Sequence, residues 1–176
     1  RFVDGRGTVV KSGGRVMKNV TGYDLVKLMA GSHGTLGVLT EVAFKLLPVP
    51  EASATLALSG LSPRAAVHAL SDALGSPFEV TGAAHLPGEA PRTLVRIEGF
   101  ADAVAYRAER LSSLFGRHGA VEVIRDADAV AAEWAAIRDV AALAGLAGEV
   151  WRISVAPSDG PAVLTALGDP PAIMDW

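Results

Sequence analysis

Apolar residues in the first part of the chain form short runs of the kind found in half-buried strands. Residues 7–12 alternate and are followed by two glycines, which predicts a strand, a hairpin turn and a returning strand over 15–20. An apolar run over 38–47, interrupted by a few polar residues, predicts another strand. Pro48 and Pro50 then interrupt any strand ladder, so we expect a domain boundary at residue 50.

A helix is predicted between these β segments, over residues 22–30, because its apolar residues recur at i, i+3 and i+4. Thr21 followed by Asp24 resembles a capping box, with Thr21 as the N-cap. Gly31 is predicted to end the helix as its C′ residue.

The second part of the chain follows the order β-α-β-β-α-β, which is the split βαβ motif of ferredoxin-like folds. The predicted strands are 54–58, 78–85, 93–100 and 120–124, and the predicted helices are 62–74 and 101–118. A helix over 128–144, a strand over 150–155 and a short helix over 161–167 follow, as if opening a second module that the chain does not finish. We therefore predict an α+β chain with domains over 1–50 and 51–176.

Composition narrows the classes of function. Half of the residues are hydrophobic and the net charge is −3, which is typical of a core-forming globular chain and gives no basic surface for nucleic acid. The absence of cysteine excludes disulfides, thiolate metal sites and a cysteine nucleophile. No metal site is predicted, because the histidines lack ligand spacing, and His68, His85 and His118 are expected on element surfaces without a role. The polar start without Met and the apolar end lead us to expect a fragment of a longer protein.

The most specific local pattern is the loop Gly31-Ser-His-Gly-Thr-Leu-Gly37, in which three glycines stand three residues apart. Such a loop can expose consecutive backbone N–H groups to a ligand. It follows a helix and precedes a strand, which is the wrong order for a dinucleotide-binding Rossmann fingerprint, and it lacks the Gly-Lys-Ser/Thr of a P-loop. From the spacing alone, a structural turn and a ligand-binding loop remain equally open.

The wider segment from Gly13 to Pro50 resembles the second half of the FAD-binding PCMH-type domain of the vanillyl-alcohol oxidase flavoprotein superfamily. The shared pattern is approximately N-x-x-G-Y-D-L-x-x-L-x-x-G-S-x-G-T-L-G-[VI]-[LI]-T-E, closing on L-x-P. Within the superfamily the chain is most similar to glycolate oxidase subunits of the GlcE type, through Lys-Asn-Val-Thr-Gly-Tyr-Asp and through the downstream residues Trp134, Arg138 and 151–155.

This resemblance implies FAD as the cofactor, bound along the glycine loop by main-chain groups. The residues that it implies for cofactor binding are Asn19, Gly22, Tyr23, His33, Gly34, Thr35, Leu36, Gly37, Val38 and Leu39. For His33 a solvated side chain, and for Tyr23 ordinary packing, remain alternatives. The part after Pro50 would be a ferredoxin-like cap domain that shapes the substrate pocket. A second FAD-contacting element, a pyrophosphate loop, is not among these residues, so the fragment alone is expected to bind FAD weakly and to be inactive.

The implied reaction is oxidation of a small 2-hydroxy acid, glycolate to glyoxylate, with hydride passing to flavin N5. Arg138 and Arg152 are candidates for the substrate carboxylate, because a guanidinium matches a carboxylate in two hydrogen bonds. Arg138 could instead stack on Trp134 or pair with Glu133 or Asp139. No catalytic residue or general base stands out.

Two other functions remain open. The protein could be a non-catalytic FAD-binding or assembly subunit, or, with the glycine loop incidental, a ferredoxin-like interaction module. The resemblance implies GlcD-like flavoprotein and GlcF-like iron–sulfur subunits as partners, and a cytoplasmic location with membrane association through those partners.

Overall fold

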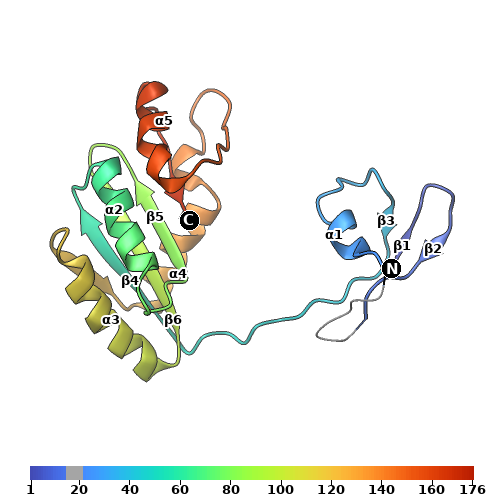
Figure 1. Ribbon diagram of the computed structural model, residues 1–176, viewed down its shortest axis with the longest axis horizontal. Helices are drawn as coiled ribbons and strands as arrows, with labels where there is room; N and C mark the ends of the chain where they lie inside the picture. The colour runs from blue at the N-terminus through green and yellow to red at the C-terminus, as the bar shows by residue number, and fades with distance from the viewer. Residues whose placement is uncertain (15–21) are drawn as a thin grey trace. The chain divides into compact units, whose positions relative to one another are not determined.

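The computed structural model describes residues 1–14 and 22–176, and it divides into two compact units, Arg1–Pro48 and Val49–Trp176. Figure 1 shows a small group of elements at the N-terminal end of the chain and a larger α/β body formed by the remainder. The predicted returning strand over 15–20, the proposed cap Thr21 and the candidate site residue Asn19 lie outside the described residues.

The first unit contains a small antiparallel sheet with the strand order β2-β1-β3. Its strands are β1 (Phe2–Val3), β2 (Val9–Val10) and β3 (Val38–Leu39). Both predicted strands in this unit are therefore too long. Thr40 and Glu41 still hydrogen-bond with the Arg1 backbone, but the chain from Val42 to Pro50 forms no helix or strand, and no described strand pairs with it.

Helix α1 (Leu25–Met29) starts later than predicted. Its N-cap is Asp24, whose carboxylate accepts a hydrogen bond from the Lys27 backbone N–H at 3.2 Å. The predicted helix start at residue 22 is therefore wrong, since Gly22 has φ +79° and cannot lie in a right-handed helix. The predicted end is present: Gly31, after the C-cap Ala30, has φ +78°.

The second unit is built on a five-stranded sheet with the order β7-β4-β6-β5-β8, in which every neighbouring pair is antiparallel. Its strands are β4 (Ala52–Ser59), β5 (Gly82–Leu86), β6 (Arg92–Gly99), β7 (Val121–Ile124) and β8 (Met174–Asp175). Its α-helices are α2 (Pro63–Leu74), α3 (Ala101–Phe115), α4 (Ala127–Arg138) and α5 (Gly160–Ala166).

Helices cover both faces of this sheet (Figure 1). Leu56 and Leu58 of β4 pack with α2 and α3 in the main core. Ala57, one residue out of phase with them, faces α4 and packs with Val130 and Trp134. The period-2 alternation of a strand thus supplies both cores from one sequence segment.

Trp134 fixes α4 on the sheet. Its indole Nε1–H donates to the buried Thr55 hydroxyl at 2.9 Å, and the Arg96 guanidinium lies 5.0 Å from the ring centroid. A Cβ on Gly82 would lie 2.8 Å from Trp134 Cζ3, so this position in β5 must be glycine for the ring to lie flat on the strand.

Strand β5 begins at Gly82, not at residue 78 as predicted. Glu79 has φ +50°, which breaks the extended backbone. Its carboxylate accepts a hydrogen bond from the buried Arg107 Nη1 at 2.9 Å, while Nη2 donates to the Glu98 carbonyl at 2.8 Å. A contact distant in sequence therefore overrides the local strand preference.

The C-terminal predictions are corrected in three places. Helix α3 ends at Phe115 rather than at residue 118. Helix α4 ends at Arg138 rather than at residue 144, because Val140 adopts φ +55°. Two 3₁₀ turns follow, η1 (Ala141–Leu143) and η2 (Pro157–Asp159). The predicted strand over 150–155 is not formed, because no strand of the described structure pairs with it.

The short helix predicted over 161–167 is present as α5. Strand β8, which was not predicted, pairs with β5 at the edge of the same sheet. Over residues 1–14 and 22–176, no helix combines the length and apolar character needed to cross a bilayer.

Candidate functional site

The glycine loop of the first unit is held by two turns. The Ser32 N–H donates to the Met29 carbonyl at 3.2 Å, and both the N–H and the hydroxyl of Thr35 donate to the Ser32 carbonyl, at 3.0 and 2.7 Å. Gly31, His33 and Gly34 all have positive φ, between +50° and +78°. The sequence folds this way because two of the three positions carry no Cβ to resist that conformation.

These turns leave several backbone donors of the loop available. The N–H groups of His33, Gly34, Leu36 and Gly37 make no backbone hydrogen bond to any described residue. Neighbouring N–H groups in a turn with left-handed residues form a concave site for an anion such as a phosphate. The loop therefore offers main-chain donors to an anionic or hydroxyl-bearing ligand.

Gly34 and Gly37 differ in why the structure requires or favours glycine. A Cβ on Gly34 would meet no atom within 4 Å, so packing within the described structure does not require glycine there, although its φ of +77° does favour it. A Cβ on Gly37 would lie only 2.4 Å from the Val3 carbonyl oxygen of β1. Gly37 is thus needed for the sheet itself, and Gly34 is the position open to a ligand.

The other predicted cofactor residues lie near this loop in sequence and are open to solvent. Tyr23 is 93% exposed, so the packing alternative for its ring is wrong in this structure. Gly22, His33, Thr35, Leu36, Val38 and Leu39 are also exposed. The hydrogen bond from the Lys27 backbone N–H lowers the pKa of the Asp24 carboxyl, which keeps a negative charge at the start of α1.

The two arginine candidates lie in the second unit. Arg138 pairs with Asp139 in two hydrogen bonds, Nε to Oδ1 at 2.7 Å and Nη2 to Oδ2 at 2.8 Å. This pairing raises the pKa of Arg138 and lowers that of Asp139, and it is one of the alternatives open from sequence. Stacking on Trp134 is performed instead by Arg96.

Arg152 lies in the exposed segment around 150–155, and no ion pair joins it to any residue of the described ranges. Its neighbour Trp151 is 77% exposed. Arg152 therefore presents a guanidinium without an ion-pair partner in the described ranges, whereas that of Arg138 is already engaged.

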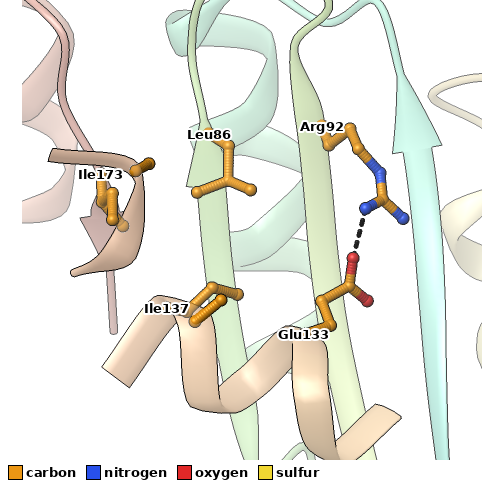
Figure 2. Close-up of a pocket in the computed structure, with 7 residues that line it drawn as sticks. Leu86, Arg92, Glu133, Ile137 and Ile173 are labelled. Carbon is orange, nitrogen blue, oxygen red and sulfur yellow. Dashed lines mark hydrogen bonds and ion pairs between the residues drawn. The ribbon is translucent and has the colours of Figure 1, made fainter. Parts of the chain in front are cut away.

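Figure 2 shows a pocket of about 300 Å³ on the α4 side of the sheet. Leu86, Ile137 and Ile173 form apolar walls, and the Arg92–Glu133 ion pair lies at the other side. Sequence reasoning missed this pocket, because its walls come from β5, β6, α4 and the segment before β8. The only early signal was the polar alternation of β6, which places Arg92 on the face opposite the main core.

One of the histidines that were expected on element surfaces is buried. His85 was predicted on an element surface, but its side chain is fully buried, with Nδ1 3.0 Å from the Thr93 hydroxyl. His118 pairs with Asp72 at 2.9 Å, and His68 is exposed. In the part of the chain that the structure describes, no three His, Asp or Glu residues gather in a way that could hold a metal ion.

Comparison with known proteins identifies the relatives of this chain, although it matches no model of a protein family. It is 34% identical over its whole length to glycolate oxidase subunit GlcE of Escherichia coli, of which it spans 45%. Over 50 residues, 28% of the chain and 11% of the relative, it is 50% identical to glycolate oxidase subunit GlcD of Bacillus subtilis. Over 42 residues, 24% of the chain and 9% of the relative, it is 52% identical to a Mycobacterium tuberculosis protein described as an FAD-linked oxidoreductase.

The chain spans less than half the length of the GlcE protein that it matches from end to end. The shorter matches include D-lactate dehydrogenases as well as glycolate oxidase GlcD. The chain is therefore similar to GlcE over its whole length and, over shorter stretches, to GlcD, to D-lactate dehydrogenases and to a protein described as an FAD-linked oxidoreductase.

Proposed function

We propose that this chain is part of an FAD-dependent oxidoreductase that converts a small 2-hydroxy acid, glycolate in the first instance, to its 2-oxo acid. The observation that carries the proposal is the glycine loop, with its unengaged N–H groups, in a chain similar throughout to GlcE. FAD, when bound, supplies the redox chemistry by accepting hydride at N5. The chain's own residues supply binding and orientation.

In this proposal the first unit is the C-terminal segment of a PCMH-type FAD-binding domain. The backbone N–H groups of His33, Gly34 and Leu36 donate hydrogen bonds to cofactor oxygens, and their role does not depend on side-chain chemistry. By resemblance to the flavoprotein superfamily, Asn19 and Tyr23 would be the residues near the flavin side of this site, and Gly22 would also contribute to cofactor binding. The side chain of His33 is exposed and contributes little.

The second unit is proposed as a ferredoxin-like cap domain. The order β7-β4-β6-β5 of its first four strands and the position of α2 and α3 on one face support this assignment. Of the two arginine candidates, Arg152 is the better carboxylate ligand, because Asp139 already occupies the guanidinium of Arg138.

As partners we propose a GlcD-like flavoprotein and a GlcF-like iron–sulfur subunit, which would take electrons onward. The proposed location is cytoplasmic, with contact to the membrane through these partners. The alternative that the chain is a non-catalytic FAD-binding or assembly subunit predicts bound FAD, or complex formation, without substrate oxidation.

The test uses the protein expressed from its complete gene. Anaerobic addition of glycolate should bleach the visible absorbance of its bound flavin. The same experiment with D-lactate tests the next larger 2-hydroxy acid as a substrate. Bound flavin that no hydroxy acid reduces would favour the non-catalytic alternative. A protein that binds no flavin in the presence of its partners would overturn the proposal.

The glycine loop can be tested with a matched pair of variants. Gly34→Ala and Gly7→Ala place a methyl group at the same backbone angle, φ +77° and φ +80°, and neither Cβ meets an atom within 4 Å. Only Gly34→Ala should weaken FAD binding, by about tenfold or more, which corresponds to loss of one or two hydrogen bonds. His33→Ala should have a smaller effect. Equal loss in the Gly7 and Gly34 variants would indicate general strain in the unit instead of cofactor contact.

A further inference from the structure

A titratable side chain lies inside the core of the second unit. The His85 ring has no exposed surface, its Nδ1 is 3.0 Å from the Thr93 hydroxyl, and its Nε2 has no partner among the described residues. A neutral imidazole tolerates this site, because one ring nitrogen can remain without a proton. An imidazolium has two N–H donors and a charge, and the site offers it no carboxylate.

The C-terminal elements cover His85. Met174 of β8 is directly opposite His85 in the β5–β8 register, so both side chains project from the same face of the sheet. Met174 reaches the first residue of α5, since a Cβ on Gly160 would lie 2.8 Å from its Cε. We call residues 157–176, which include η2, α5 and β8, the C-terminal lid.

The lid is attached by few contacts. Strand β8 has two residues and lies at the sheet edge, and α5 has seven residues with Leu164 as its only buried one. The Trp176 N–H donates to the Ala83 carbonyl at 3.0 Å, and Trp176 packs against the main core. No ion pair in the described ranges joins the lid to the remainder of the unit. A short edge element of this kind can open without unfolding the main sheet.

The charged groups on the packed elements are poorly placed to stabilise an imidazolium. The residues opposite His85 are Thr93 on β6 and Met174 on β8. Arg92 and Asp175 are their immediate neighbours in sequence, so the side chains of both project from the other face of the sheet. On that face Arg92 pairs with Glu133. Helix α5 has no titratable side chain. The remaining titratable residues on α2 and η2 are exposed: Arg64, His68, Asp72 and Asp159.

We propose that the C-terminal lid opens at acidic pH: uptake of a proton by His85 opens the lid and exposes the outer edge of β5. Burial lowers the pKa of His85 below its ordinary value of 6.5. The closed lid is therefore fully stable above pH 6.5 and loses stability as the pH falls from 6.5 toward the lower pKa of the closed state.

Hydrogen exchange of the whole chain tests this proposal. After correction for the intrinsic pH dependence of exchange, protection of amides in residues 168–176 should fall by up to about tenfold between about pH 7.5 and about pH 5.5. Amides of α3 should keep their protection over the same range. Equal loss in α3 and in the lid would show global unfolding and would overturn the proposal, as would a lid whose protection does not change.

Two histidine variants assign the effect. His85→Gln keeps a polar atom for the Thr93 hydroxyl but does not titrate in this range, so its lid protection should be independent of pH. His68→Gln removes an exposed histidine and should retain the response of the original chain. If His85→Gln does not fold, the imidazole resonances of the unaltered chain provide the second measurement. A His85 resonance that titrates near 6.5, as a solvent-exposed imidazole does, would contradict the proposal.

Discussion

Replacing Trp134 by phenylalanine should destabilise the second unit, because the indole makes two interactions that a phenyl ring does not replace. Its Nε1–H donates at 2.9 Å to the hydroxyl of Thr55, a residue with no exposed surface. Its ring also lies 5.0 Å from the Arg96 guanidinium. The phenyl ring keeps an aromatic face for Arg96 but has no donor for Thr55.

The expected cost can be worked from these contacts. Leaving the buried Thr55 hydroxyl without its donor costs about 1–3 kcal/mol. A weaker cation–π contact between Arg96 and the smaller ring adds up to about 0.5–1 kcal/mol. Together these give a loss of roughly 1–4 kcal/mol in the free energy of unfolding, before any cost of the space left by the indole.

Urea unfolding followed by far-ultraviolet circular dichroism measures this loss, with Trp151→Phe as the control because Trp151 is largely exposed. The double variant Thr55→Val, Trp134→Phe should recover about 1 kcal/mol or more, since removing both hydrogen-bonding partners leaves no unsatisfied group. A Trp134→Phe chain as stable as the Trp151 control, or a double variant whose losses simply add, would refute the reasoning.

Three further substitutions separate structural from functional residues. Gly37→Ala should destabilise the sheet of the first unit by about 1–3 kcal/mol, through contact with the Val3 carbonyl, and faster amide exchange in β1 and β3 would report it. Arg107→Met should lower the unfolding free energy of the second unit by about 0.5–1.5 kcal/mol, because the part-buried Glu98 carbonyl loses the hydrogen bond that Arg107 Nη2 donates; an unchanged urea midpoint would contradict this. Arg152→Gln should raise KM for glycolate more than Arg138→Gln does, and steady-state kinetics giving the opposite order would favour Arg138 as the carboxylate ligand.

The strands of the second unit could be predicted from sequence wherever a segment with strand-like alternation also pairs with a neighbouring strand. Strands β4 and β6 pair over eight residues, and their alternation matches the two cores that they face. The segment over 150–155 has an equally strand-like pattern but remains unpaired in the described structure. Alternation shows that a segment can pair, whereas pairing depends on a neighbour that the local sequence does not specify.

The same distinction applies to the candidate site. The glycine loop could be singled out from sequence because the spacing of its glycines and its residue pattern are local features. The structure adds that Gly37, and not Gly34, is packed against a strand. The burial of His85 and the pocket beside Arg92 were missed, because each depends on residues brought together from distant segments. Glu79 shows this directly, since its left-handed conformation accompanies an ion pair with Arg107, 28 positions away.

The unpaired segment from Val42 to Pro50 also determines how the chain should respond to proteases. Its residues are exposed and make no helix or strand, so its backbone can enter a protease active site without prior unfolding. A lysine-specific protease should therefore cut after Lys45, and the larger unit contains no lysine at which it could be cut. The product would be a stable C-terminal fragment with the whole five-stranded sheet, which could then be purified and studied separately from the glycine loop.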